Sequence, residues 1–169
     1  MKSIEIILSV ATSKDGFIAD KYGNGDFSSP EDKEQFRAFL RTCDAFVCGR
    51  KTADAFAERL TFKPLFVLSK GPRTDPRYIY ISSIKELSSE LKKRDLHKVA
   101  LLGGKETYDY FLRQNCVTGI RLTTEGCSLS EGLALNLKPY LKDFSSPQIK
   151  HLSAQTTFSS FQRKSEIDV

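Results

Sequence analysis

Residues 99–112 read Val99-Ala100-Leu101-Leu102-Gly103-Gly104-Lys105-Glu106-Thr107-Tyr108-Asp109-Tyr110-Phe111-Leu112, an apolar run joined to an amphipathic run by two glycines. Four consecutive apolar residues predict a strand that is buried on both faces of a sheet. After the glycines, Tyr108, Phe111 and Leu112 recur at helical spacing and predict a helix that packs by one face. The glycines permit a tight turn and the close approach of a ligand, and the helix N-terminus behind them offers N–H groups to a phosphate. A strand-to-helix turn without any ligand is an equally good interpretation of this stretch alone.

Two further apolar runs end in polar or basic residues. Asp44-Ala45-Phe46-Val47-Cys48 predicts a short buried strand, and Gly49-Arg50-Lys51-Thr52 then begins a second helix. The first turn of that helix carries two cations and a hydroxyl, which together with backbone N–H groups are suited to hold a phosphate. Leu65-Phe66-Val67-Leu68 predicts another strand, which leads into Ser69-Lys70-Gly71-Pro72.

The rest of the chain alternates expected strands with expected helices. We expect strands at residues 4–11, 78–81, 119–124, 149–155 and 157–163, and helices from about residue 30 and at about 83–94, the latter opening with the capping box Ser83-Ile84-Lys85-Glu86. This alternation predicts an α/β fold with a mainly parallel central sheet, helices on both faces and an antiparallel C-terminal hairpin, in a single domain of residues 1–169. Ligands of such sheets bind beyond the carboxyl ends of the strands. Because the three junctions all follow strand ends, we predict a phosphate-rich dinucleotide as the ligand.

The helix that begins near residue 30 has a clear N-terminal signal. Ser29 is expected as the N-cap and Pro30 as the first helical residue, with acids, among them Asp32, in the first turn. Asp32 has two interpretations, because an acid at this place either stabilises the helix N-terminus or serves a binding site. Arg37 and Arg41 share another face of the helix, where they are either solvated or available to a substrate phosphate.

The composition argues against several classes of protein. The 169 residues suffice for one domain, and 40% apolar with 28% charged residues is ordinary for a globular protein. No apolar run approaches the roughly 20 residues of a membrane helix, so we expect a cytoplasmic protein without a membrane partner. The formal charge of +5 is spread along the chain, which fits a small anionic ligand better than nucleic acid. The four cysteines lack Cys-x-x-Cys spacing and the two histidines are isolated, so we expect mostly buried free thiols and no metal site.

Taken together, these features resemble the dihydrofolate reductase fold, and within it the reductase domain of bifunctional riboflavin biosynthesis enzymes. The resemblance runs from Ala11 to about Phe161. It rests on five motifs in the expected order, each loose on its own: Ser13-Lys14-Asp15-Gly16-Phe17-Ile18-Ala19, Gly49-Arg50-Lys51-Thr52, Lys63-Pro64-Leu65-Phe66-Val67-Leu68-Ser69, Leu102-Gly103-Gly104 with its helix, and Leu122-Thr123 followed by Leu129-Ser130-Glu131-Gly132-Leu133-Ala134-Leu135.

The resemblance implies NADPH as the cofactor. It implies that the Gly49–Thr52 turn binds phosphates, and that Ser69, with Lys70 as a charge partner, binds the adenosine 2′-phosphate. The Gly103-Gly104 turn is implied to lie against the nicotinamide and pyrophosphate, often with a cis peptide bond. The full set of implied cofactor contacts is Ala11, Ile18, Gly49, Arg50, Lys51, Thr52, Leu68, Ser69, Lys70, Leu102, Gly103, Gly104, Lys105, Glu106, Thr107 and Tyr108.

The resemblance also implies a substrate site. Asp32, two residues after Pro30, matches the carboxylate that holds the heterocycle and is the expected catalytic residue, with Thr123 supporting it and Phe36 beside the substrate. Two features depart from the folate enzymes, because the chain has no Trp and has Lys63-Pro64-Leu65 where those enzymes place an Arg. The deaminase motifs His-x-Glu and Pro-Cys-x-x-Cys are absent, so the chain resembles a stand-alone reductase domain.

We therefore predict hydride transfer from NADPH to 5-amino-6-(5-phosphoribosylamino)uracil or a related ribosylaminopyrimidine phosphate, by a protein that we expect to be a homodimer. Dihydrofolate reductase is the first alternative, favoured by Asp32 and Thr123 and disfavoured by the missing Trp. A nucleotide-binding protein without catalysis and a nucleic-acid-binding protein are further alternatives, and the sequence offers neither of them direct support.

Overall fold

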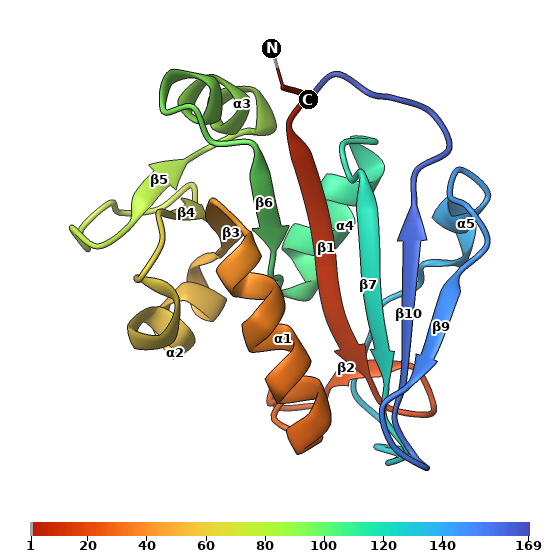
Figure 1. The fold of residues 1–169 in the computed structure, drawn as a ribbon. Helices are drawn as coiled ribbons and strands as arrows, with labels where there is room; N and C mark the ends of the chain where they lie inside the picture. The colour runs from red at the N-terminus through yellow and green to blue at the C-terminus, as the bar shows by residue number, and fades with distance from the viewer. Residues whose placement is uncertain (1) are drawn as a thin grey trace.

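An eight-stranded sheet forms the centre of the computed structural model, which describes residues 2–169, with strand order β5-β4-β3-β6-β1-β7-β10-β9 (Figure 1). The strands are β1 (Glu5–Thr12), β2 (Phe17–Ala19), β3 (Ala45–Gly49), β4 (Leu65–Leu68), β5 (Ile79–Ile81), β6 (Lys98–Leu101), β7 (Gly119–Thr124), β8 (Leu133–Ala134), β9 (Gln148–His151) and β10 (Thr157–Gln162). The helices are α1 (Pro30–Thr42), α2 (Arg50–Leu60), α3 (Ile84–Lys93), α4 (Lys105–Arg113) and α5 (Lys138–Leu141).

The six strands from β5 to β7 run parallel, and β10 and β9 complete the sheet as antiparallel neighbours. A separate small sheet pairs β2 with β8. The predicted fold class is therefore confirmed, including the antiparallel hairpin at the C-terminus. The first hairpin strand is shorter than predicted, since Ser153 turns the chain: its hydroxyl accepts hydrogen bonds from the N–H groups of Gln155 and Thr156.

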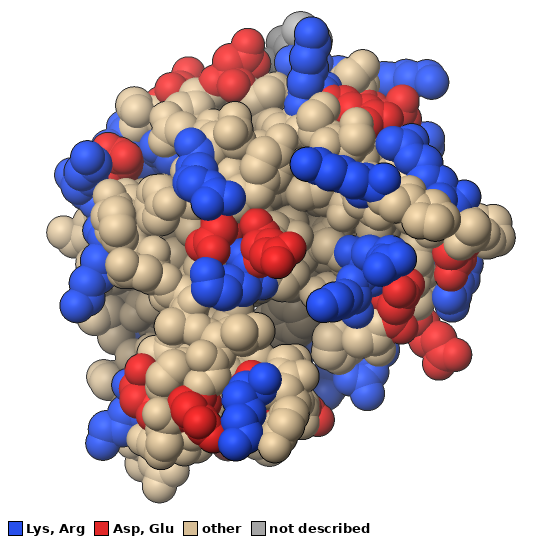
Figure 2. All heavy atoms as spheres, turned by 180° about the vertical axis from the view of Figure 1, so that it is seen from behind, with Lys and Arg blue, Asp and Glu red and all other residues tan. Residues whose placement is uncertain are grey.

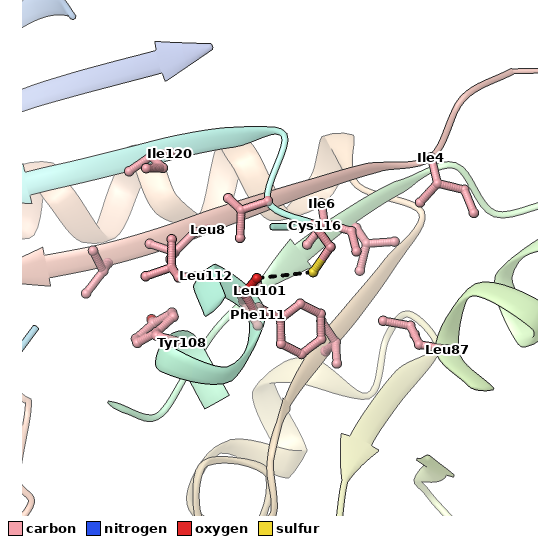
Figure 3. Close-up of a cluster of buried hydrophobic side chains, with 14 of the residues drawn as sticks. Ile4, Ile6, Leu8, Leu87, Leu101, Tyr108, Phe111, Leu112, Cys116 and Ile120 are labelled. Carbon is pink, nitrogen blue, oxygen red and sulfur yellow. Dashed lines mark hydrogen bonds between the residues drawn. The ribbon is translucent and has the colours of Figure 1, made fainter. Parts of the chain in front are cut away.

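Helices cover the two faces of the sheet with separate cores. On one face, α1 and α2 bury Phe39, Leu40 and Leu60 against β3 and β4. On the other, the predicted apolar face of α4 packs among residues of β1 and β6, and Figure 3 shows Phe111 beside Leu101 in this cluster. The central strands are buried from both sides, which explains why their sequences are almost wholly apolar.

Two of the helices begin at serine caps. The Ser29 hydroxyl accepts a hydrogen bond from the N–H of Asp32, and Pro30 is the first residue of α1, as predicted. Ser83 caps α3 through the N–H of Glu86. The predicted capping box is only half formed, because the Glu86 carboxylate accepts from both the N–H and the hydroxyl of Ser82, one residue before the cap. Ser82 offers that carboxylate two donors, where the Ser83 backbone offers one.

The thiols, the surface charge and the helix lengths were each the subject of a prediction from composition. Three cysteines are buried, as expected for most of the four, and Cys127 is exposed. On the face seen in Figure 2, Lys and Arg side chains are interleaved with Asp and Glu instead of forming one basic surface. Within residues 2–169, every helix is too short or too polar to cross a bilayer.

Asp15 joins the loop after β1 to the loop after β7. Its carboxylate accepts hydrogen bonds from the Ser13 hydroxyl (2.6 Å) and from the backbone N–H groups of Leu129 (3.1 Å) and Ser130 (2.8 Å). The bond from Ser13 is the largest cause that lowers the pKa of Asp15 from 3.8 to about 2. The two loops lead into β2 and β8, so this carboxylate helps to hold the small sheet in place.

Asp15→Asn should lower the melting temperature at neutral pH, because the amide cannot accept all three bonds as well as a carboxylate does. A carboxylate with a depressed pKa stabilises the folded state above its unfolded pKa, near 4, and that contribution is lost as the pH falls toward about 2. The difference between parent and variant should therefore shrink between pH 4 and pH 2 in thermal melts. Asp168→Asn, at an exposed position, is the control. A loss of melting temperature in Asp15→Asn that is the same at every pH tested would contradict this role.

Candidate functional site

The predicted phosphate-binding junctions meet because β3 and β6 are neighbours. The N–H of Leu102 donates to the carbonyl of Val47 (2.9 Å), and the N–H of Gly49 donates to the carbonyl of Gly103 (2.7 Å). These bonds bring the N-termini of α2 and α4 side by side at the carboxyl edge of the sheet. The third junction is adjacent, because Leu68 pairs with Gly49 across β4 and β3.

The N-termini of α2 and α4 lack the caps that α1 and α3 have. Their N-cap residues are Gly49 and Gly104, and neither offers a side chain to the first-turn N–H groups. The uncapped first turns of α2 and α4, and with them the positive ends of two helix dipoles, therefore lie beside each other at this edge of the sheet. Such an arrangement is suited to a phosphate or pyrophosphate group.

The glycines at the two junctions are required for different reasons. Gly103 has a φ of +103°, and an added Cβ would lie 2.9 Å from the Tyr108 ring. An added Cβ on Gly49 would lie 2.8 Å from the Thr107 hydroxyl. Gly104 is the exception, since its added Cβ would meet nothing closer than the Thr52 hydroxyl at 3.6 Å. The Gly103-Gly104 peptide bond is cis, as the family resemblance suggested.

The side chains around these glycines divide into exposed and internal ones. Arg50 and Lys51 are exposed at the start of α2. Lys105 is held by its own helix, with its ammonium 2.6 Å from the Asp109 carboxylate. Tyr108 is buried, its hydroxyl donates to the carbonyl of Ser9 (2.7 Å), and burial raises the pKa of this phenol. The Tyr108 ring thus packs against Gly103, and its hydroxyl is bonded to the Ser9 carbonyl.

The remaining predicted cofactor residues follow the same edge. Ser69 lies at the end of β4, where its N–H donates to the carbonyl of Ile81 and its hydroxyl accepts from the N–H of Gly71 (3.1 Å). Lys70 beside it is exposed, as is Glu106, while Thr107 is buried against Gly49. Partly exposed side chains also occur at the predicted apolar contacts, which are Ala11, Ile18, Leu68 and Leu102, and at the predicted substrate contact Phe36.

Asp32 lies inside a hydrogen-bond network, although it is only two residues from the start of α1. Its side chain is buried, and its Oδ1 accepts from the Thr123 hydroxyl (2.5 Å) and from the Gln35 side-chain amide (2.9 Å). In the described chain no side chain or backbone N–H donates a hydrogen bond to Oδ2. The pairing of Asp32 with Thr123 is the one that the family resemblance implied.

Three polar residues that sequence reasoning missed complete this region. Glu125 is buried and accepts from the N–H of Ser29 (2.8 Å) and from the Thr156 hydroxyl (2.7 Å), which fixes the start of α1 against the end of β7. Gln35 and Arg121 extend the Asp32 network. A signal existed for both: Gln35 is three residues after Asp32 on a helix, and Arg121 is two before Thr123 on a strand, so each shares a face with a predicted residue.

A cavity of about 450 Å³ lies at the start of α1, between Glu31, Glu125 and the Ser153–Thr156 turn. None of the glycine-junction residues lines it, and neither does Asp32. The adjoining uncapped N-termini of α2 and α4 and the buried Asp32 carboxylate therefore identify the candidate site better than the cavity does. In residues 2–169, His, Cys, Asp and Glu side chains form no cluster suited to a metal ion.

Comparison with known proteins identifies the family of the chain. The model of the family described as the RibD C-terminal domain matches residues 5–126, which include every predicted site residue. The chain belongs to the RibD C-terminal domain family. Over 153 residues it is 28% identical to the uncharacterized protein YyaP of Bacillus subtilis (strain 168), covering 80% of this chain and 81% of YyaP.

Two solved structures share the fold of this RibD C-terminal domain chain. A putative riboflavin biosynthesis protein from Shewanella sp. PV-4 has a TM-score of 0.71 at 21% identity, covering 96% of this chain and all of that one. A diaminohydroxyphosphoribosylaminopyrimidine deaminase/5-amino-6-(5-phosphoribosylamino)uracil reductase from Thermotoga maritima has a TM-score of 0.75 at 15% identity. That match covers 95% of this chain and 57% of the longer Thermotoga maritima protein. At these identities the likeness shows a shared fold.

Gly104→Ala should leave the melting temperature nearly unchanged, because its Cβ would meet only an ordinary contact in the free protein. It should nevertheless weaken binding of a dinucleotide several-fold, since the methyl group lies where the ligand would approach the uncapped α4 N-terminus. Gly103→Ala is the contrast and should destabilise the fold, because of its positive φ and the Tyr108 ring. Thermal melts and cofactor titration measure both effects, and normal binding by Gly104→Ala would show that this glycine serves the turn alone.

Proposed function

We propose that the chain is an NADPH-dependent reductase of the riboflavin biosynthesis type, acting on 5-amino-6-(5-phosphoribosylamino)uracil or a related ribosylaminopyrimidine phosphate. The observation that carries the proposal is the pairing of β3 with β6, which joins two uncapped helix N-termini at one edge of the sheet. Membership of the RibD C-terminal domain family supports it, as does the shared fold with a reductase from Thermotoga maritima.

The residues at the junctions fit a dinucleotide phosphate. A Cβ on Gly104 would take up space that is open apart from the Thr52 hydroxyl at 3.6 Å, and the adjoining first turns of α2 and α4 have no side-chain cap. Arg50 and Lys51 would add charge at the pyrophosphate, and Ser69 with Lys70 would meet a phosphate on the adenosine ribose. When bound, NADPH supplies the hydride; the protein supplies orientation and a site with little water.

The substrate would be held from the α1 side of the site. Oδ2 of Asp32 receives no hydrogen bond from the protein, so this oxygen is available to accept a hydrogen bond from an N–H of a heterocycle, or to exchange a proton with the heterocycle. The partly exposed Phe36 ring, one helical turn further on, offers an apolar surface for a flat ring. In this proposal Asp32 orients the substrate or helps to protonate it.

The test is NADPH oxidation, followed by absorbance, with the ribosylaminopyrimidine phosphate and with dihydrofolate as separate substrates. Asp32→Asn should lower turnover of the true substrate at least about a hundredfold, as expected for loss of a general acid or an orienting carboxylate, with NADPH affinity nearly intact. Glu31→Gln is a matched control, because it removes an exposed acid from the same helical turn. Turnover that falls equally in both variants would assign Asp32 to helix stability.

Dihydrofolate reduction is the second candidate function. The hydrogen bond between Thr123 and Asp32 favours it, because the resemblance to folate enzymes implies this pair. Turnover of dihydrofolate but not of the ribosylaminopyrimidine phosphate would establish it in place of the first proposal. Absence of turnover with both, combined with tight NADPH binding, would instead indicate a nucleotide-binding protein without this catalysis.

NADPH should bind at least about tenfold more tightly than NADH, because Ser69 and Lys70 can meet the additional phosphate and charge-assisted hydrogen bonds are strong. Fluorescence titration of the two cofactors measures the ratio. Lys70→Ala should reduce the preference mainly by weakening NADPH, whereas Lys85→Ala, an exposed lysine on α3, should leave both affinities unchanged. Equal affinities for the two cofactors in the parent protein would contradict the assignment of Ser69 and Lys70.

A further inference from the structure

The Gln35 amide has only one orientation that satisfies its neighbours. Its Oε1 faces the guanidinium of Arg121, with Nη2 at 3.2 Å, and arginine has donors only. The amide oxygen must therefore lie on that side. The Nε2 group is then directed at Asp32 Oδ1 (2.9 Å) and at the Thr123 hydroxyl oxygen (3.0 Å), to which it donates.

Arg121 is itself held in place. Its guanidinium carbon lies over two aromatic rings, 4.3 Å from the centroid of Phe39 and 4.6 Å from that of Phe158. It forms no ion pair with any residue of the described chain, so its hydrogen bond to Gln35 is not in competition with a carboxylate. A charged, stacked and partly buried donor thus fixes the direction of the amide.

The directions of these bonds determine the roles of the two Asp32 oxygens. Thr123 donates its hydroxyl hydrogen to Oδ1 and accepts from Gln35, and Gln35 donates to Oδ1 as well. Oδ1 therefore only accepts, and a proton on this carboxyl group would have to reside on Oδ2. The side chain cannot exchange its two oxygens without breaking both bonds.

The geometry points to Gln35 as a positioning residue for Asp32. Arg121 sets the direction of the Gln35 amide, the amide holds Asp32 Oδ1, and Oδ2 is left available to the substrate. This inference rests on the proposed function, in which Asp32 contacts the heterocycle. The side-chain hydrogen bonds of Gln35 go to Asp32, Thr123 and Arg121 and not to the glycine junctions. Its effect should therefore be on the orientation of the substrate and on the rate of reduction, and not on the cofactor.

The kinetic test compares Gln35→Met with Glu34→Met, an exposed position on the same helix. Gln35→Met should lower kcat about tenfold to a hundredfold, the scale expected for a misplaced catalytic group, with the NADPH dissociation constant unchanged. Glu34→Met should leave kcat unchanged. In an Asp32→Asn background, Gln35→Met should lower kcat no further, because the two residues act as one unit. Additive losses would overturn the proposal.

A conservative replacement separates positioning from a structural role. Gln35→Glu keeps the shape and can still accept from Arg121, but it has no N–H for Asp32 and places a second carboxylate beside it. If Gln35 only anchors Arg121, the Glu variant should restore the activity that the Met variant loses. If it positions Asp32, the Glu variant should be at least as impaired as the Met variant, and recovery of activity would refute the inference.

A readout independent of turnover keeps this inference separate from the proposed function. The side-chain amide signals of Gln35 in ¹H–¹⁵N spectra should shift in Asp32→Asn and in Arg121→Met, and remain in place in Glu34→Met. If the parent protein reduces neither substrate, the proposed function is wrong, but the spectra still test whether Gln35 is bonded to Asp32 and Arg121. Gln35 amide signals that stay in place in both Asp32→Asn and Arg121→Met would show that these hydrogen bonds do not form.

Discussion

The pairing of β3 with β6 is the constraint on which the candidate site depends. Both strands are buried on both faces, so their register is set by core packing, and a slip of one residue would exchange their faces. In the observed register the bond between the N–H of Gly49 and the carbonyl of Gly103 is the last one before both chains turn into helices. The core thus brings the two strand ends together, and the glycine turn after β6 completes the contact between the two helix N-termini.

The first turns of the helices differ in a way that local stability alone does not explain. α1 has a serine cap and the acids Glu31 and Asp32, both of which favour the positive end of the helix dipole. α2 has neither a cap nor an acid, and it begins with the cations Arg50 and Lys51. Cations there oppose the dipole, so an anion in front of this helix start would stabilise it. The sequence therefore gives up stability at the place where the phosphate is proposed to bind.

Local signals made much of this arrangement predictable from the sequence. Ser29 with Pro30, and the glycines before α4, act on neighbouring backbone groups, so sequence spacing is sufficient to place them. The Gln35 contacts were not predicted, because they join a helix to Arg121 and Thr123, nearly ninety residues away. The side chain of Tyr108 is buried, as its helical spacing predicted, while its assignment to the cofactor comes from the family resemblance alone and stays a prediction.

The two interpretations of Asp32 predict different partners for its carboxylate. An acid that serves only the helix start would turn toward backbone N–H groups or remain in water, but Ser29 already caps the helix. The Asp32 carboxylate instead lies buried against β7 and receives donors from Thr123 and Gln35. Burying a carboxylate costs free energy, which the two donors offset, and no cation forms an ion pair with it in the described chain. A helix start does not require that cost, whereas a site that must present one oriented oxygen to a substrate does.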